Sequence, residues 1–147
     1  MLPAPPDFSA HYSAAFRQVM PAAHGEALSP TEALGRWQEL IQEILAGYCD
    51  IPPELDNDLD VAREPLEHAL HQVALLALPE RQLFAQHIQA LDEVFKSVTV
   101  EHPEWGRNDA THWWEGRVLT FAGREYRNFC GFGHSLKQQG IIIQPLF

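Results

Sequence analysis

The chain has 147 residues, of which 46% are hydrophobic and 20% charged, and a formal net charge of −10. This length suits one domain with a single hydrophobic core, and the composition excludes an intrinsically disordered chain. The acidic balance disfavours sequence-independent nucleic-acid binding, which needs clustered lysine and arginine, but it is compatible with attraction to a basic protein.

The N-terminal segment combines a proline-rich start with a predicted helix. Residues 1–6 are expected to fray, and they contain neither the basic nor the apolar region of a secretory signal. The helix is predicted from about Asp7, which supplies the N-cap, to Met20, and Pro21 ends it. Its apolar face consists of Phe8, Tyr12, Ala15, Phe16 and Val19.

The second predicted helix has the clearest start signal in the chain. Ser29 is the N-cap, and residues 30–32 supply a proline at the first helical position and the glutamate of a capping box. Gly47 and then the proline pair 52–53 are expected to end this helix. Its apolar stripe is Leu34, Trp37, Ile41, Ile44 and Tyr48.

Two further helices follow an acidic connection that runs from Asp50 to Asp60. The third is predicted over about 65–78 and the fourth from Pro79, with almost no loop between them. These two helices should therefore form a tight corner or hairpin. The fourth shows the four-three spacing of antiparallel bundle packing at Phe84, Ile88, Leu91, Phe95 and Val98.

The C-terminal tail changes to short β patterns. Residues 117–121 and 124–129 are predicted to form a β-hairpin around a glycine turn. Residues 135–139 suit one helical turn, and 141–143 suit a buried strand. An isolated hairpin is marginal in water, so this small sheet is expected to dock on the helices.

These elements predict an α+β fold that is mainly α, with an N-terminal four-helix assembly and a small C-terminal antiparallel β unit packed on it. One domain is predicted over 1–147, with an acidic helical body at 7–104 and an aromatic, glycine-rich tail at 105–147. The body carries 17 acidic and 5 basic side chains, whereas the tail carries 3 and 5.

The two cysteines, Cys49 and Cys130, are too few for a disulfide framework. A reducing cytoplasm is therefore the expected compartment, with a single long-range bridge as the alternative. No stretch approaches the roughly 18 apolar residues of a membrane helix, and no complete cofactor motif is present, so neither a membrane nor a cofactor is predicted.

One candidate catalytic pair is Cys130 with His134. A thiol can be activated by a nearby histidine, and glycines at 131 and 133 let the backbone approach a ligand. The spacing matches no nucleophile motif, and the alternative is a glycine-rich strand exit with a buried thiol.

A second candidate is a metal site of His68, His71 and His87. His68 and His71 are three residues apart on the third predicted helix, with Glu64 and Glu67 four residues before them, and these side chains can share a surface. Imidazole and carboxylate are ligands for zinc and similar ions. The alternative is a solvated helix face with ordinary Glu–His pairing.

The favoured function is a non-enzymatic acidic module that binds a basic protein, such as a bacterial immunity or inhibitor protein, an antitoxin or a chaperone-like protein. Trp113 and Trp114 are predicted to anchor the partner, because aromatic side chains are favoured at binding hot spots. The alternatives are a small enzyme that uses either site above, and a homodimer formed through Leu40 and Leu45 beside the main stripe of the second helix. The acidic residues predicted to steer the partner are Asp50, Glu54, Asp56, Asp58 and Asp60.

Overall fold

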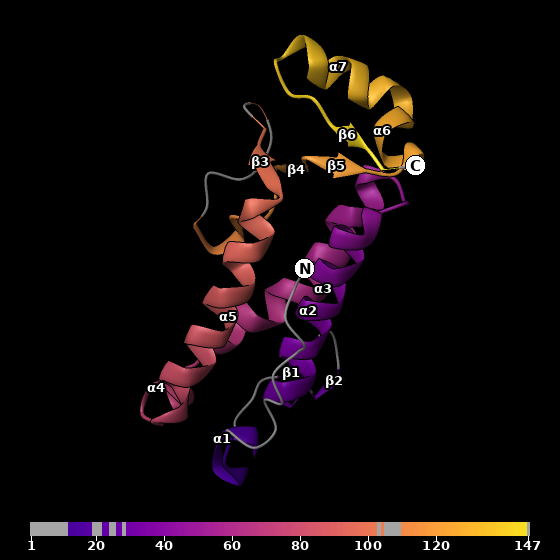
Figure 1. The fold of residues 1–147 in the computed structure, drawn as a ribbon. Helices are drawn as coiled ribbons and strands as arrows, with labels where there is room; N and C mark the ends of the chain where they lie inside the picture. Colours follow the sequence, from indigo (N-terminus) through magenta and orange to yellow (C-terminus); the bar gives the residue numbers. More distant parts are fainter. Residues whose placement is uncertain are drawn as a thin grey trace.

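The computed structural model describes residues 12–18, 22–23, 26–27, 29–102, 104 and 110–146. The helices are α1 (Ala14–Gln18), α2 (Pro30–Gly47), α3 (Pro52–Leu70), α4 (Val73–Leu76), α5 (Glu80–Ser97), α6 (Arg124–Asn128) and α7 (Phe132–Gln138). The strands are β1 (Ala22–Ala23), β2 (Glu26–Ala27), β3 (Thr99–Glu101), β4 (Arg117–Leu119), β5 (Phe121–Ala122) and β6 (Gln144–Pro145), and short 3-10 turns lie at Ala110–His112 and Phe129–Gly131. Figure 1 shows α2, α3 and α5 as the body, with β5, β6, α6 and α7 gathered beyond one end of it. The predicted α+β, mainly α fold class is confirmed.

Helix α2 begins as its sequence predicts. The Ser29 side chain accepts a hydrogen bond from the Glu32 backbone N–H at 3.1 Å, and Pro30 occupies the first turn. Trp37 lies on the buried side of the helix and is fully buried. The helix ends at Gly47, whose φ of 109° falls in the region that favours glycine.

Helix α3 begins earlier than the sequence pattern predicts. Pro52 and Pro53 form its first turn, because a proline at a helix start gives up no intrahelical hydrogen bond and its φ is already helical. The acidic residues 54–60 therefore lie inside a helix and not in a connection. Pro65 is buried in the interior of α3, and the helix ends at Leu70 instead of continuing to residue 78.

The short helix α4 links α3 to α5. Helix α5 starts at Glu80, directly after Pro79, which confirms the predicted start. Arg81 Nη2 donates to the Leu70 carbonyl oxygen at 2.9 Å and so satisfies one of the last carbonyl groups of α3. A side-chain hydrogen bond therefore closes the tight turn expected between these helices.

A buried ion pair joins the three long helices. Arg63 on α3 is 2% exposed, and its Nε and Nη2 donate to Asp92 Oδ1 and Oδ2 on α5, both at 2.9 Å. Trp37 Nε1 on α2 donates to the same Oδ1 at 3.0 Å. Arg63 Nη1 lies 3.0 Å from Glu67 Oε2, and the guanidinium carbon lies 5.0 Å from the Trp114 ring centroid. Because buried charges are costly unless they are paired, this network fixes how the helices meet.

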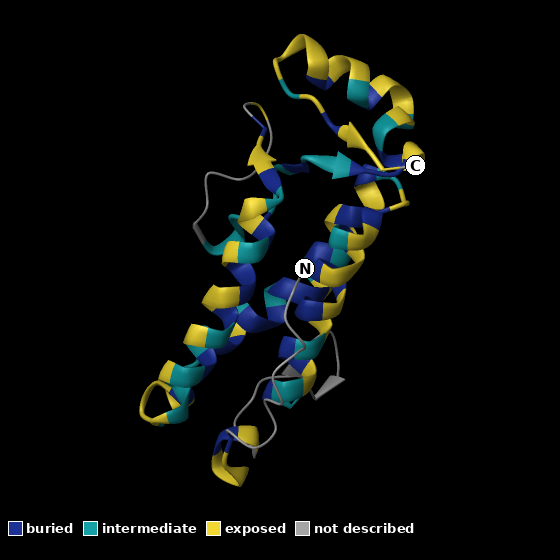
Figure 2. Cartoon of the chain, in the orientation of Figure 1, coloured by how far each residue is buried: buried dark blue, intermediate teal, exposed yellow. Residues whose placement is uncertain are grey.

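Apolar side chains from all three long helices fill the core. Leu34, Leu66 and Phe95 are fully buried, one from each long helix. Figure 2 shows buried positions along the facing sides of α2, α3 and α5, and exposed positions on the outer side of α7. Val118 and Leu136 from the tail belong to the same buried cluster, so the tail packs on the body as predicted. Among the described helices, none has the length and apolar character of a membrane span.

The predicted first helix is described only in part. Phe8 and Val19 of its predicted apolar face lie outside the described residues. Tyr12 and Phe16 are buried, and the Phe16 ring centroid lies 5.5 Å from that of Phe84 on α5. These contacts attach the α1 segment to the body.

The predicted β-hairpin in the tail is wrong. Strand β4 pairs instead with β3, in antiparallel register with Thr99 opposite Leu119, and β5 pairs in parallel with β6. Gly123 donates its N–H to the Tyr48 carbonyl oxygen at 2.8 Å, and α6 begins directly after it. In this helix the Tyr126 ring is buried, and its hydroxyl accepts a 3.3 Å hydrogen bond from the Leu119 N–H. Contacts with distant parts of the chain therefore outweigh the local hairpin pattern.

The end of the chain also differs from the prediction. The helical turn expected over 135–139 is present within α7, but the strand expected over 141–143 is not formed. Ile143 is 8% exposed and Ile142 is 60% exposed, so one isoleucine enters the core while its neighbour faces solvent.

Two helical glycines give a matched test of how closely the tail helices pack. A Cβ at Gly133 would lie 2.6 Å from the Arg127 carbonyl oxygen, whereas a Cβ at Gly35 would have no heavy atom within 4 Å. Gly35→Ala should therefore raise the free energy of unfolding by about 0.5–1 kcal/mol through helix propensity. Gly133→Ala should lower it by about 1–3 kcal/mol, because the backbones must separate. Urea denaturation measures both, and equal stabilisation by the two variants would contradict the close approach of α6 and α7.

Candidate functional site

The acidic residues predicted to steer a partner divide into two groups. Asp58 Oδ2 accepts a 2.7 Å hydrogen bond from the Tyr48 hydroxyl, and Asp60 Oδ1 accepts one of 3.2 Å from Trp114 Nε1. These two carboxylates therefore help to hold α3 against its neighbours. The exposed members of the set are Asp50, Glu54 and Asp56.

The two tryptophans predicted to anchor a partner do not form an exposed pair. Trp114 is fully buried, and its indole N–H is used by Asp60, so this side chain belongs to the core. Trp113 is half-buried, with its ring centroid 6.0 Å from that of Phe95 and 4.5 Å from Lys96 Nζ. The Lys96 ammonium group makes a cation–π contact there.

The histidines proposed for a metal site have other neighbours. His71 Nε2 lies 3.1 Å from Glu67 Oε1 on the same helix, and His87 Nδ1 lies 3.1 Å from the Tyr12 hydroxyl. His68 is exposed on α3. Within the part of the chain that the structure describes, no group of three or more histidine, cysteine, aspartate or glutamate side chains could hold a metal ion.

The proposed Cys130–His134 pair is not joined by a contact among the described residues. His134 Nε2 lies 3.2 Å from Gln138 Nε2, and Cys130 is exposed. Cys130 has a φ of 46°, which is unusual for a residue other than glycine, and Gly131 follows with a φ of 74°. Cys49 is also a free, exposed thiol, so the long-range disulfide considered from the sequence is not formed.

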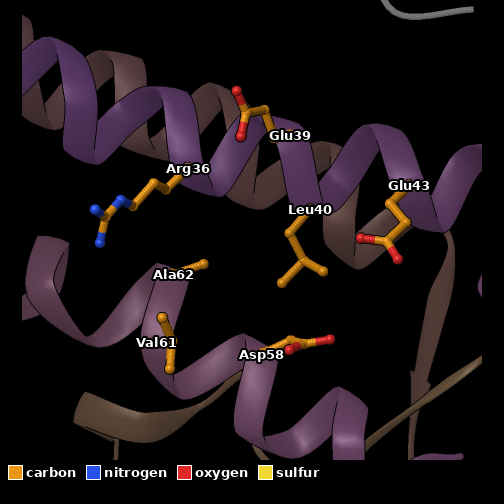
Figure 3. A pocket seen from close by; sticks show the side chains of 7 residues that line it. All are labelled: Arg36, Glu39, Leu40, Glu43, Asp58, Val61 and Ala62. Atoms are coloured by element: carbon orange, nitrogen blue, oxygen red, sulfur yellow. The ribbon is translucent and has the colours of Figure 1, made fainter. Parts of the chain in front are cut away.

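A groove between α2 and α3 is lined by carboxylates from both helices, and Figure 3 shows Glu43 directed toward α3 and Glu39 on the side of α2 away from it. The groove has a volume of about 300 Å³. Leu40 and Ala62 are buried and Val61 is 39% exposed, so an apolar strip lies among the charged side chains. The described lining holds three carboxylates and one guanidinium group, a formal charge of −2. This acidic groove is lined by Arg36, Glu39, Leu40, Glu43, Asp58, Val61 and Ala62.

Glu39 and Glu43 are not among the site residues predicted from the sequence. They lie four residues apart on α2, and that spacing places them on one side of the helix. This signal is readable in the sequence. What the sequence does not reveal is that α3 packs alongside and adds Asp58 to the same groove.

A second cavity lies between the start of α3 and the turn that leads into α7. Its volume is about 360 Å³. Asp56 supplies its carboxylate, and desolvation by the surrounding protein raises the pKa of that carboxyl, although the side chain keeps contact with solvent. The nearby charge of Asp60 raises the pKa further. This aromatic pocket is lined by Pro52, Pro53, Asp56, Phe129, Cys130, Phe132 and Ser135.

Comparisons of the chain with protein-family models, with curated proteins and with solved structures find no match. The two cavities on α3 and the charges around them are therefore the features that bear on function.

The tyrosines give a pH test of the packing around α3. The chain has three, Tyr12, Tyr48 and Tyr126, and all are buried. Burial raises the pKa of each hydroxyl above its ordinary value of 10.0, and for Tyr48 the hydrogen bond to Asp58 raises the pKa further.

The contribution of the three buried, protonated tyrosines to the free energy of unfolding is therefore complete below pH 10, where the tyrosines of the unfolded chain are protonated as well. Above pH 10 the free energy of unfolding should fall by about 1.4 kcal/mol per tyrosine per pH unit. Phenolate absorbance, followed together with circular dichroism, measures this loss. Reversible ionisation of any tyrosine near pH 10 in the folded protein would contradict the described burial.

Proposed function

We propose that this chain is a non-enzymatic, acidic protein-binding module whose acidic groove receives basic side chains of a protein partner. The observation that carries the proposal is that Glu39 and Glu43 of α2 and Asp58 of α3 line one groove beside an apolar strip. A lysine or arginine side chain has the complementary form, an apolar stem that ends in a cation. Its stem would lie on Leu40 and Val61 while its charge pairs with a carboxylate.

The charge of the whole chain supports the same kind of partner. At −10, the protein attracts a basic surface over long range and so speeds association, an effect that weakens as salt is added. Exposed Asp50 and Glu54 at the start of α3 extend the negative surface. The corresponding roles are a bacterial immunity or inhibitor protein, an antitoxin or a chaperone-like protein, in a reducing cytoplasm.

The alternative of a small enzyme has less support. Cys130 has no contact with His134 among the described residues, and His71 and His87 are each occupied by another side chain. The acidic groove needs no further group to bind a cation, since Glu39 and Glu43 are exposed on α2 and the half-buried Asp58 adds a third carboxylate from α3.

The test compares partner capture by three forms of the protein from native lysate at low and at high salt. The forms are wild type, Glu39→Gln/Glu43→Gln, and a control, Glu93→Gln/Glu101→Gln, with the same change in net charge on exposed positions outside the groove. Wild type and control should retain a basic protein at low salt and release it at high salt. The groove variant should lose it, with an association rate reduced by about tenfold.

Mass spectrometry identifies the retained protein, and stopped-flow fluorescence measures its association rate with each form. Equal capture by the groove variant and the wild type would contradict the proposal. Equal loss in the control and the groove variant would also contradict it, because net charge alone would then explain binding.

A further inference from the structure

We propose that the aromatic pocket binds an arginine side chain of the same basic partner, an inference that rests on the proposed function. The pocket combines one carboxylate, Asp56, with two proline rings and the rings of Phe129 and Phe132. No lysine, arginine or histidine is among its described lining residues. A cation with a flat, apolar face is therefore the ligand chemistry that this lining complements.

The main chain around Cys130 forms one wall of the pocket. Cys130 and Gly131 both have positive φ angles, and this turn brings Phe129 and Phe132 to the same cavity. The Phe132 ring packs edge-on against the buried Tyr126 ring, with ring centroids 5.3 Å apart and planes at 87°. The aromatic wall is thus supported by the core before any ligand arrives.

The opposite wall comes from the first turn of α3. Pro52 and Pro53 start that helix and line the pocket, and Asp56 follows one turn later. The pKa of the Asp56 carboxyl is raised by desolvation and by Asp60, and no cationic side chain is among the described residues that line the pocket with it. A guanidinium group in the pocket would supply the missing compensation, whereas an anion would be repelled by both carboxylates.

Arginine fits this lining better than lysine does. A guanidinium group is planar and weakly hydrated, stacks on aromatic faces and pairs with a carboxylate through two parallel hydrogen bonds. A lysine ammonium group is compact and strongly hydrated, so it loses more hydration in a pocket walled by phenylalanine and proline.

The two cysteines provide an internal readout. Cys130 lines the pocket and Cys49 does not, while both are free and exposed. The full-length protein is alkylated with iodoacetamide in the presence of acetyl-Ala-Arg-Ala-amide at millimolar concentration, and both sites are quantified by mass spectrometry. The arginine peptide should slow alkylation of Cys130 several-fold and leave Cys49 unchanged. The same peptide with citrulline, which is neutral, should protect neither thiol.

Variants test the role of the carboxylate. Asp56→Asn should raise the peptide concentration needed for half-maximal protection of Cys130 by about tenfold, because the charge-assisted hydrogen bonds are lost. Glu125→Gln, an equal charge change on exposed α6, should leave protection unchanged. The arginine site would be overturned if the citrulline peptide protected Cys130 as well as the arginine peptide does, or if the arginine peptide protected Cys49 as well as Cys130. It would also be overturned if Cys130 were as well protected in Asp56→Asn as in the wild type.

The inference and the proposed function can fail separately. If the groove variant loses the partner but the arginine peptide leaves Cys130 unprotected, the pocket assignment is overturned and the acidic module stands. If Cys130 is protected while the groove variant captures the partner normally, the arginine site stands and the groove is the wrong docking surface.

Discussion

The ion pair between Arg63 and Asp92 is the contact on which the arrangement of the long helices depends. Removing two charges from water costs several kcal/mol per ion, and only complete pairing offsets that cost. Trp37 supplies a further donor to Asp92, and Glu67 places a second carboxylate 3.0 Å from Arg63 Nη1. Because one residue of slip would rotate Arg63 by about 100° around α3, the network specifies a single register of α3 against α2 and α5.

The same register decides which acidic side chains remain exposed. Asp58 and Asp60 bond to aromatic side chains that anchor α3, so part of the acidic stretch has a structural role. Glu39 and Glu43, on the neighbouring helix, stay exposed beside the groove. Net charge alone therefore overstates the exposed acidic surface, and the proposed binding groove draws its negative charge from two helices that only the tertiary fold brings together.

The sequence predicts well where local chemistry decides the structure. Ser29 caps α2, and α5 follows Pro79, as expected from their side chains. Prediction fails where distant contacts decide: the hairpin pattern gives way to α6, where the Tyr126 ring packs against Tyr48 and the Gly123 N–H bonds to the Tyr48 carbonyl oxygen. Distant contacts also decide the site residues. The sequence predicts Trp114 as a surface anchor for a partner, but its ring is fully buried beside Arg63. The exposure of a side chain depends on which other elements pack against it, and the spacing of residues along the chain does not reveal these tertiary contacts.

A double-mutant cycle across the buried ion pair tests the central claim most directly. The free energy of unfolding is measured by urea denaturation for wild type, Arg63→Met, Asp92→Leu and the double variant. Each single variant leaves a buried charge without its partner and should lose about 3–5 kcal/mol. The double variant should recover a large part of that loss, giving a strong coupling energy. Single variants with near-wild-type stability, or losses that simply add, would contradict the claim that this ion pair joins the three helices.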